Sequence, residues 1–238
     1  MKTLVLSDAH VPFQSRKWDR EVKKFIRLEQ PAKIVLNGDM ADFHALSQHR
    51  RNPKWEDNFE REIKGLWKWL EDLRQIAPKS DIRYVEGNHE ARWNTYVQGR
   101  APVLRMIGMD WDRYCGLPEL GIKKTKAGFK VPCGQGQRVA LFHGHEGRLG
   151  LSKFAGGTAY KFVHEHGCNV HIGHTHKMGM QVTRVGGRAF FGAEGGYGGD
   201  IRKPAFDFIN ARKPPWTLGF SYYDSEQTLS PYPNFVRV

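Results

Sequence analysis

Cysteine is scarce in this chain, with only three among its 238 residues. The three are Cys115, Cys133 and Cys168, and an odd number without close pairs supplies neither a disulfide framework nor the paired-cysteine spacing of a zinc site. A disulfide-stabilised secreted domain is therefore excluded, and we expect three reduced thiols.

Long apolar runs are also missing. The mean hydropathy is −0.60, and no stretch approaches the ~20 apolar residues that a membrane-spanning helix needs. The apolar start of the chain is interrupted at Asp8 and His10, which is too early for a secretory signal peptide. We therefore expect a cytoplasmic protein with no membrane partner.

Acidic residues are too few to balance the basic ones. The chain has 25 Asp and Glu residues against 37 Lys and Arg residues, a formal net charge of +12 at pH 7. A net charge of this size indicates the kind of partner that a protein binds but does not indicate its fold. Contacts with phosphate groups supply most of the non-specific affinity of proteins for nucleic acid. We therefore predict nucleic acid as a partner, although some basic proteins bind none.

Internal repeats, low-complexity tails and linkers are absent as well. A chain of this length can bury a sizeable core without disulfides or metal staples. The sequence therefore predicts a single domain spanning residues 1–238, and no feature indicates its oligomeric state.

What the chain does contain is a series of short polar clusters, each placed directly after an apolar run typical of a strand. The five clusters are Asp8-Ala9-His10, Gly38-Asp39, Gly87-Asn88-His89-Glu90, His143-Gly144-His145 and Gly173-His174-Thr175-His176. Loops at strand ends gather ligand-binding groups. Five such loops carrying Asp, Asn or His indicate one site that holds metal.

The element pattern is that of an α/β fold. A strand at 3–7, a helix at 17–29 and a strand at 33–37 predict that the two strands pair in parallel through a right-handed crossover. The spacing of apolar residues predicts a long helix over 56–76, with Trp69 outside its apolar face. Further strands are expected at 82–85, 129–132, 137–142, 169–172, 180–185, 188–191, 216–223 and 235–238, and further helices at 90–98, 101–109 and 152–165. Residues 91–126 follow the third cluster, so we expect them to form a substrate-selecting insertion.

The side chains of the clusters narrow the metal. Asp, Asn and His without Cys suit borderline or hard divalent ions, and we expect Mn²⁺, with Fe²⁺, Zn²⁺, Ni²⁺ or Co²⁺ as alternatives. Two ions ~3.5–4 Å apart could share a bridging carboxylate and activate a water molecule between them. The clusters hold enough ligands for two divalent ions.

In order and strand context, the five clusters resemble the motifs of the calcineurin-like metallophosphoesterase superfamily, in the style of its small phage and prokaryotic members related to repair nucleases. The resemblance spans residues 4–176; any one motif is weak, whereas five in order are specific. It implies a four-layer α/β/β/α sandwich of two mixed sheets flanked by helices, with the metal site at strand-end loops.

The resemblance also implies roles for individual residues. The first ion would be held by Asp8, His10 and His176, the second by Asn88, His143 and His174, with Asp39 bridging both. A hydroxide between the ions would attack phosphorus in line, and His89 would protonate the leaving oxygen or steady the scissile phosphate. General acid catalysis of this kind is typically worth ~10²–10⁴-fold.

Several neighbours of these residues have two interpretations. Arg92 could meet the substrate phosphate or be a solvated arginine on a helix face. Either His143 or His145 could reach the metal, and the family pattern favours His143. We expect Asp42 to be a helix N-cap and not a support of the site, and we expect His171, inside a strand, to be structural.

Departures from the motifs of one subfamily narrow the range of substrates. Ser/Thr phosphatases of the superfamily carry Asp-x-His-Gly and Gly-Asp-x-Val-Asp-Arg-Gly, but here Val11 follows His10 and the second motif lacks Arg-Gly. A protein phosphatase is therefore disfavoured. A non-catalytic nucleic-acid-binding scaffold is also disfavoured, because no implied ligand is replaced.

The positive charge favours a nuclease-like phosphodiesterase acting on nucleic acid. Aromatic residues near the expected insertion, namely Trp93, Tyr96, Trp111 and Tyr114, could stack bases while cations hold the backbone. The same aromatics could equally belong to the core. A phosphomonoesterase and a small-molecule or cyclic-nucleotide phosphodiesterase are the alternatives.

Overall fold

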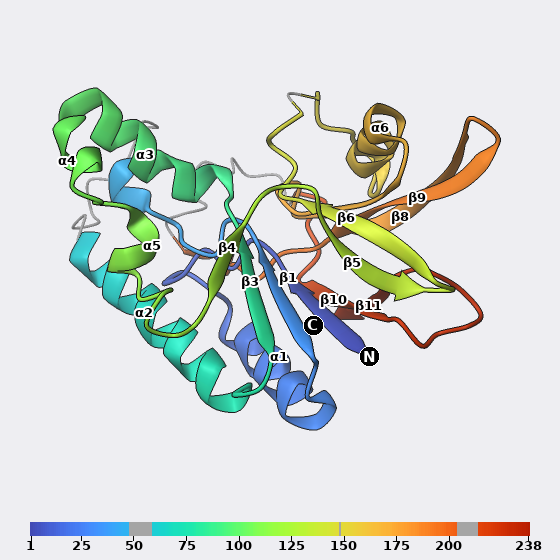
Figure 1. Cartoon of the computed structure of the whole chain (residues 1–238), viewed down its shortest axis with the longest axis horizontal. Coiled ribbons are helices and arrows are strands. Elements are labelled where there is room, and N and C mark those ends of the chain that lie inside the picture. Colours follow the sequence, from blue (N-terminus) through green and yellow to red (C-terminus); the bar gives the residue numbers. More distant parts are fainter. Residues whose placement is uncertain (48–58, 148, 204–213) are drawn as a thin grey trace.

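The structure, a computed structural model of the chain, describes residues 1–47, 59–147, 149–203 and 214–238, apart from the side chains of Arg105 and Met106. Within these residues the strands form two sheets (Figure 1). The six-stranded sheet has the order β11-β10-β1-β2-β3-β4. Its strands are β1 (Lys2–Leu6), β2 (Lys33–Asn37), β3 (Asp81–Val85), β4 (Lys123–Thr125), β10 (Gly219–Asp224) and β11 (Asn234–Arg237). Strands β1 to β4 pair in parallel, and β10 and β11 add antiparallel pairs, so this sheet is mixed.

The second sheet has five strands in the order β5-β6-β7-β9-β8. Its strands are β5 (Phe129–Gly134), β6 (Gln137–Phe142), β7 (Asn169–Ile172), β8 (Met178–Val185) and β9 (Arg188–Gly195). The pairs β6–β7 and β7–β9 are parallel, whereas β5–β6 and β8–β9 are antiparallel hairpins. This sheet is therefore mixed as well.

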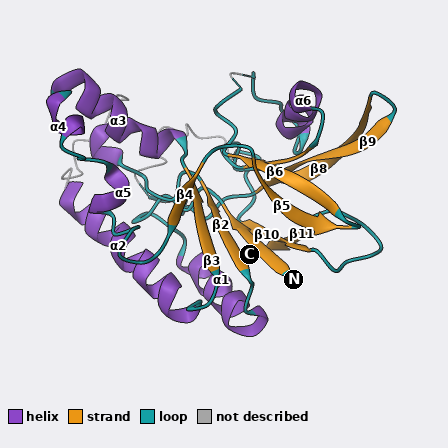
Figure 2. Ribbon diagram, in the orientation of Figure 1, coloured by secondary structure: helices purple, strands orange, loops and turns teal. Residues whose placement is uncertain are grey.

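Helices flank both sheets (Figure 2). They are α1 (Arg16–Glu29), the short 3-10 helix η1 (His44–Leu46), α2 (Phe59–Ile76), α3 (Asn88–Arg100), α4 (Val103–Met106), α5 (Trp111–Tyr114) and α6 (Gly157–His166). α1 and α2 pack on the outer face of the six-stranded sheet, and α6 packs on the outer face of the five-stranded sheet. The layers are helix, sheet, sheet and helix, which confirms the predicted four-layer α/β/β/α sandwich.

The alternation of side chains along the central strands separates two apolar layers. Leu4 and Ile34 are buried against the helices, while the adjacent Val5 and Val35 are buried against the second sheet, where they join Leu141. Both faces of β1 and β2 are therefore covered. Strands covered on both faces have near-continuous apolar sequences, which is why these two could be recognised from the sequence.

Some boundaries differ from the prediction. The helix expected from residue 152 begins at Gly157, because Gly156 adopts a φ of +78° and a Cβ there would lie 2.8 Å from the backbone of Met180. The helix expected from residue 56 begins, within the described residues, at Phe59; its predicted start at 56–58 lies outside them. Trp69 is buried, stacks on the ring of Trp18 and donates a hydrogen bond to Asp19.

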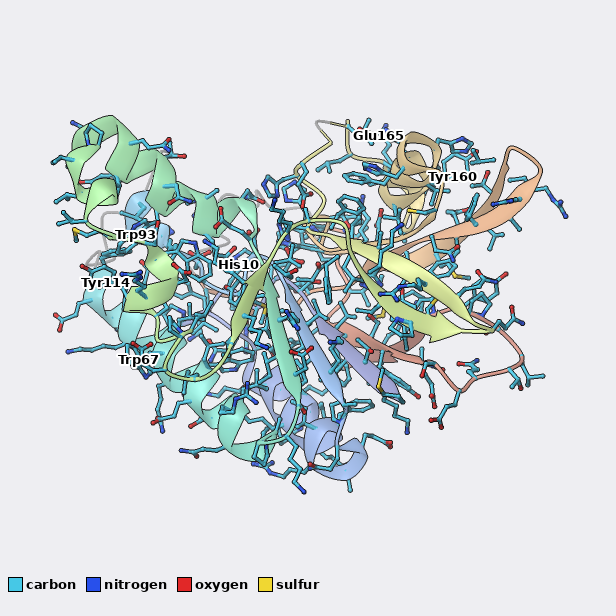
Figure 3. The ribbon with its side chains drawn as sticks, viewed as in Figure 1. His10, Trp67, Trp93, Tyr114, Tyr160 and Glu165 are labelled. Carbon is cyan, nitrogen blue, oxygen red and sulfur yellow. The ribbon has the colours of Figure 1, made fainter. Side chains whose placement is uncertain are left out.

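Residues 91–126 are built into the fold at the edge of the six-stranded sheet. They include most of α3, the helices α4 and α5, and the edge strand β4. Trp93 and Trp111 are 6% and 0% exposed, whereas Tyr96 and Tyr114 are 51% and 41% exposed; Figure 3 shows Trp93 and Tyr114 on the helical side of the molecule. The two tryptophans are therefore core residues, and of the four aromatics expected near the substrate only the tyrosines have accessible rings.

The cysteines agree with a further expectation. Cys115, Cys133 and Cys168 are all free thiols. Across the part of the chain that the structure describes, none of the helices combines the length and apolar character needed to cross a bilayer.

Candidate metal centre

The predicted site residues meet where the carboxyl ends of the central strands of both sheets come together. Asp8 follows β1, Asp39 follows β2 and Asn88 opens α3 shortly after β3. His143 follows β6 and His174 follows β7 in the other sheet. Parallel strands deliver their following loops to one edge of a sheet, so clusters far apart in the sequence share this junction.

The first group of possible ligands consists of Asp8, His10 and His176. Their ligand atoms all lie within 4.8 Å of one another, and all three side chains are buried. Nε2 of His176 lies 3.3 Å from Oδ1 of Asp8 and 3.3 Å from Nε2 of His10; Figure 3 places His10 at the junction of the two sheets. Two imidazole nitrogens that face each other require either a proton on one of them or a shared cation.

The second group consists of Asp39, His143 and His174, whose ligand atoms also lie within 4.8 Å of one another. Nε2 of His143 lies 3.2 Å from Oδ2 of Asp39 and 3.1 Å from Oδ1 of Asn88. Asn88 therefore extends this group with an amide oxygen. All seven residues that the sequence suggested as ligands lie in these two neighbouring groups.

The hydrogen bonds of His143 determine which of its nitrogens faces the pocket. Nδ1 lies 2.9 Å from the carbonyl oxygen of Asn37, and because a carbonyl can only accept, Nδ1 carries the hydrogen. The lone pair of Nε2 then points at oxygens of Asp39 and Asn88, which is repulsive unless a cation intervenes. Burial lowers the pKa of His143, but the carboxylates of Asp39 and Asp8 outweigh burial and raise the pKa to about 10. The pocket therefore attracts a cation, either a proton or a metal ion, to Nε2.

Two buried carboxylates face the same pocket. Burial, assisted by the charge of Asp39, raises the pKa of Asp8 to about 6. Burial acts in the same direction on Asp39, but the imidazoles of His143 and His89 hold the pKa of that carboxyl well below its usual range. A buried carboxylate is costly unless an opposite charge accompanies it. Carboxylate, imidazole and amide donors in this arrangement fit divalent transition metals.

Five residues of the pocket adopt the left-handed backbone conformation. They are Asp8 (φ 55°), His10 (φ 51°), Asp39 (φ 51°), His174 (φ 62°) and His176 (φ 59°). Residues other than glycine seldom adopt this conformation, and each instance costs about 1–3 kcal/mol unless its surroundings impose it. Hydrogen bonds between the loops impose it here, for instance from the amides of Asp8 and His10 to the carbonyls of Gly38 and Asp39, both at 3.0 Å. Such strain collects at functional sites.

Asp42 supports the site, and its predicted role as a helix N-cap is wrong. The N-cap of η1 is Phe43, whereas the carboxylate of Asp42 is buried, with Oδ1 lying 2.9 Å from Nδ1 of His10 and 3.1 Å from Nδ1 of His89. Burial would raise the pKa of Asp42, but these hydrogen bonds hold it well below its usual range. A carboxylate bonded to Nδ1 orients an imidazole so that Nε2 is left to bind metal. We therefore interpret Asp42, His10 and His89 as a hydrogen-bonded cluster and not as a third metal site.

His89 lies beside Asp39 and is bonded to Arg92. Nε2 of His89 is 3.7 Å from Oδ2 of Asp39 and 2.9 Å from Nη2 of Arg92. Because arginine only donates, Nε2 accepts and Nδ1 carries the hydrogen, which points at the carbonyl of Asp42 at 2.8 Å. Burial lowers the pKa of His89, but the charges of Asp39 and Asp42 outweigh burial and the pKa is raised.

Arg92 is therefore not a solvated arginine on a helix face. It is half-buried, and besides its bond to His89 its Nη1 donates to the carbonyl of Asp42 at 3.0 Å. Its guanidinium lies at the rim of the candidate metal centre. Contact with a substrate phosphate stays a prediction.

Glu90 is a site residue to which sequence analysis assigned no role. Its fully buried carboxylate accepts four hydrogen bonds, from the amides of Asp39 (3.0 Å), Gly87 (2.8 Å) and Ala41 (2.9 Å) and from the hydroxyl of Tyr84 (2.7 Å). These bonds tie the loop after β2 to the start of α3. A glutamate at the third position of a helix that accepts a hydrogen bond from the amide of the residue before the helix, here Gly87, is half of a capping box. The position of Glu90 three residues after Gly87 was therefore a signal in the sequence.

The two remaining histidines of interest lie farther from the ligand groups. The ring centroid of His145 is 5.4 Å from that of His143 and 6.3 Å from that of His174, and among the described residues neither ligand group includes it. His171 is buried inside β7, with Nδ1 2.9 Å from the hydroxyl of Tyr223. Burial lowers the pKa of His171 to about 3, so it is neutral and structural, in agreement with the prediction.

Known proteins resemble this chain in sequence and in structure. The chain is 28% identical over 192 residues to the Gene 54 protein of Mycobacterium phage L5, which covers 78% of this chain and 72% of that protein. Among solved structures it resembles a single mutant of Vps29 from Entamoeba histolytica (TM-score 0.46, 15% identity, 100% of this chain and 98% of that one). It also resembles the phosphoesterase YfcE from E. coli (TM-score 0.45, 19% identity, 94% of this chain and 88% of that one). The sequence pattern of calcineurin-like phosphoesterases matches residues 1–178 of the 238, and the chain therefore belongs to the calcineurin-like phosphoesterase family.

Proposed function

We propose that this protein hydrolyses phosphodiester bonds in nucleic acid with the help of two divalent cations, Mn²⁺ foremost. The convergence of two groups of Asp and His ligand atoms, buried except for the half-buried His174, carries the proposal. One cation would be held by Asp8, His10 and His176 and the other by Asn88, His143 and His174, with Asp39 shared between them.

Two divalent cations, when bound, polarise a phosphoryl group and lower the pKa of a water molecule that can attack it. The chain's own contribution is to hold the ligands in place beforehand. Asp42 fixes the ring of His10 through Nδ1, and Glu90 fixes the loop that carries Asp39. Ligands that are already oriented lose little free energy to rearrangement during the reaction.

His89 is the residue that we propose as the proton donor to the leaving oxygen. The charges of Asp39 and Asp42 raise its pKa above the ordinary value against the effect of burial, and general acid catalysis needs a protonatable group of this kind within reach of the leaving oxygen. Protonation would place a hydrogen on Nε2, which now accepts from Arg92. Because Nε2 cannot then accept, Nη2 of Arg92 would be free to bind a phosphate oxygen, while Nη1 keeps its bond to the carbonyl of Asp42.

The net charge of +12 supports nucleic acid as the substrate, because a basic protein attracts polyanions. The test is a panel of substrates in Mn²⁺ together with metal analysis of the purified protein. The panel contains single- and double-stranded DNA, RNA, a cyclic nucleotide, a phosphopeptide, and mono- and bis-p-nitrophenyl phosphate.

We expect about two transition metal ions per chain and cleavage of nucleic acid together with the bis-substituted ester. Cleavage of monoesters alone would replace the proposal by a phosphomonoesterase. A metal-free protein that binds nucleic acid without cutting it would replace the proposal by a scaffold.

A further inference from the structure

A cleft of about 650 Å³ lies between η1 and α3 and opens directly beside the candidate metal centre. Its lining includes Asn88 and Arg92 at the inner end and Tyr96, Gly99 and Arg100 farther out. α3 runs from the strand ends towards α4 at the far side of the molecule (Figure 1). The cleft therefore leads away from the site along one helix.

The residues that line it recur at a regular interval. Asn88, Arg92, Tyr96 and Arg100 follow one another at four-residue steps, so they lie on neighbouring positions of one helix face. A helix rises ~1.5 Å per residue, which places consecutive members ~6 Å apart and Arg100 ~18 Å from Asn88 along the axis. The row therefore extends well beyond the reach of a single phosphoester.

The chemistry of the row suits a chain of phosphates that carries flat rings. The described lining residues include two guanidinium groups and no carboxylate. Tyr96 is 51% exposed, which leaves its side chain accessible for stacking. Base–aromatic stacking combined with a positively charged groove is how proteins bind single strands without sequence preference.

We propose that single-stranded nucleic acid lies along this cleft, with a backbone phosphate near Arg92, a base against Tyr96 and a further phosphate at Arg100. The proposal rests on the proposed function, because that function places the scissile phosphodiester at the inner end of the cleft. A stacked nucleotide advances ~3.4 Å along its strand, so the row spans several nucleotides. The outer residues therefore distinguish a strand from a small diester.

Three substitutions test the cleft without touching the metal centre. Tyr96→Ala removes the stacking surface and Arg100→Ala removes the outer cation. Gly99→Leu narrows the cleft: a Cβ at Gly99 meets no described atom within 4 Å, and leucine favours a helix more than glycine does. Gly99→Leu should therefore fold normally.

Each substitution has a matched control. Gly99→Ala adds only a methyl group and should leave the cleft open. Tyr160→Ala removes an exposed tyrosine from α6, 38% exposed and remote from the cleft (Figure 3). Arg188→Ala removes an exposed arginine at the β8–β9 turn.

The first measurement is binding in EDTA, which prevents cleavage. Binding of a labelled oligothymidylate, and of the matching RNA, is measured by fluorescence anisotropy. Tyr96→Ala should weaken binding roughly 5- to 100-fold, and Gly99→Leu should cause a clear loss of binding. Arg100→Ala should reduce the slope of the logarithm of the binding constant against the logarithm of the salt concentration by about 1. The three controls should bind as the wild type does. The proposal would be overturned if Tyr96→Ala and Gly99→Leu bound the oligonucleotide with the affinity of the wild type. It would also be overturned if these variants kept oligonucleotide binding and lost binding of a phosphopeptide.

The second measurement separates the cleft from the chemistry. In Mn²⁺, the three variants should lower kcat/KM for the oligonucleotide far more than kcat/KM for bis-p-nitrophenyl phosphate, since that ester cannot extend along a row that reaches ~18 Å from Asn88. If no diester is cleaved but the variants lose oligonucleotide binding, the proposed function fails and the cleft assignment stands. If the wild type cleaves oligonucleotides and the variants do so equally well, the cleft assignment fails and the proposed function stands.

Discussion

Oδ1 of Asp42 lies 2.9 Å from Nδ1 of His10, and both side chains are 2% exposed. The same carboxylate oxygen lies 3.1 Å from Nδ1 of His89. Asp42 therefore sets the hydrogen positions of two imidazoles with different proposed roles, through its carboxylate for the proposed metal ligand His10 and through its carboxylate and carbonyl oxygens for the proposed proton donor His89. Residues bonded to metal-ligating histidines in this way tune both orientation and basicity.

Asp42→Ala should accordingly weaken metal binding about 10- to 100-fold, because the ring of His10 loses the partner that holds Nε2 towards the pocket. Isothermal titration with Mn²⁺ of the metal-stripped protein measures the effect. Asp72→Ala is the matched control, because Asp72 lies on α2 and pairs with Lys23 and Lys68 at the surface. Equal Mn²⁺ affinity in the two variants would contradict the role of Asp42.

Glu90→Gln should lower the free energy of unfolding by about 2–4 kcal/mol, because an amide group cannot accept all four hydrogen bonds and leaves buried donors unsatisfied. Urea denaturation of the metal-stripped protein gives the value. Glu60→Gln, at an exposed carboxylate of α2, should change stability little. A Glu90→Gln variant as stable as Glu60→Gln would show that the loop after β2 does not depend on this carboxylate.

The sequence predicted those parts of the molecule whose signal is local. β1 and β2 are buried on both faces, so each forms an unbroken apolar run, and each ligand cluster follows its strand directly. The edge strand β4 was missed because Lys123 and Lys124 are exposed and carry no apolar alternation. The helix α5 is a single turn, too short for a periodic pattern.

The supports of the site could not be predicted in the same way, because their partners are distant in sequence. Asp42 bonds His10 across 32 residues and Glu90 bonds the amide of Asp39 across 51. Each of these carboxylates looks like an ordinary helix-start residue until the loops are brought together. The tryptophans of residues 91–126 illustrate the same point, since their burial follows from the packing of α3 and α5 against the sheet and not from their spacing.

Asp39→Asn should abolish turnover and weaken metal binding at both positions, because it removes the charge that the two cations would share. The fold should survive: an asparagine oxygen can still accept from the amide of His89, as Oδ1 of Asp39 does at 2.9 Å, and its amide can donate to Nε2 of His143. Elemental analysis and hydrolysis of bis-p-nitrophenyl phosphate are the measurements, with circular dichroism as the check on folding. Normal activity would refute the shared position of Asp39.

His89→Ala should keep the metal content and lose rate according to the leaving group. For the alkoxide leaving group of a nucleic acid the loss should be ~10²–10⁴-fold, and for nitrophenolate it should be much smaller, because that group needs no proton. Comparing kcat for an oligonucleotide and for bis-p-nitrophenyl phosphate separates the two. A loss of equal size on both substrates would assign His89 to phosphate binding and not to proton transfer.

Glu62 gives a prediction for the dependence of stability on pH. Its carboxylate lies under η1 and accepts the amides of His44 (2.7 Å) and Ala45 (2.9 Å), yet burial raises its pKa from 4.5 to about 7. Between these two values the folded chain binds more protons at this position than the unfolded chain does. The free energy of unfolding contributed by Glu62 therefore falls as the pH rises from about 4.5 to about 7, by on the order of 3 kcal/mol in total.

Glu62→Gln removes this titration, so the wild type should lose stability relative to the variant over that range. Urea denaturation at several pH values between 4.5 and 7.5, in EDTA, gives the difference between the two proteins. A glutamine that leaves one of the two amides unsatisfied shifts the variant by a constant amount at every pH, so the slope and not the offset carries the test. If the difference in the free energy of unfolding between the two proteins does not change with pH, Glu62 keeps an ordinary pKa. The hydrogen bonds from the two amides of η1 would then offset the effect of burial on that pKa.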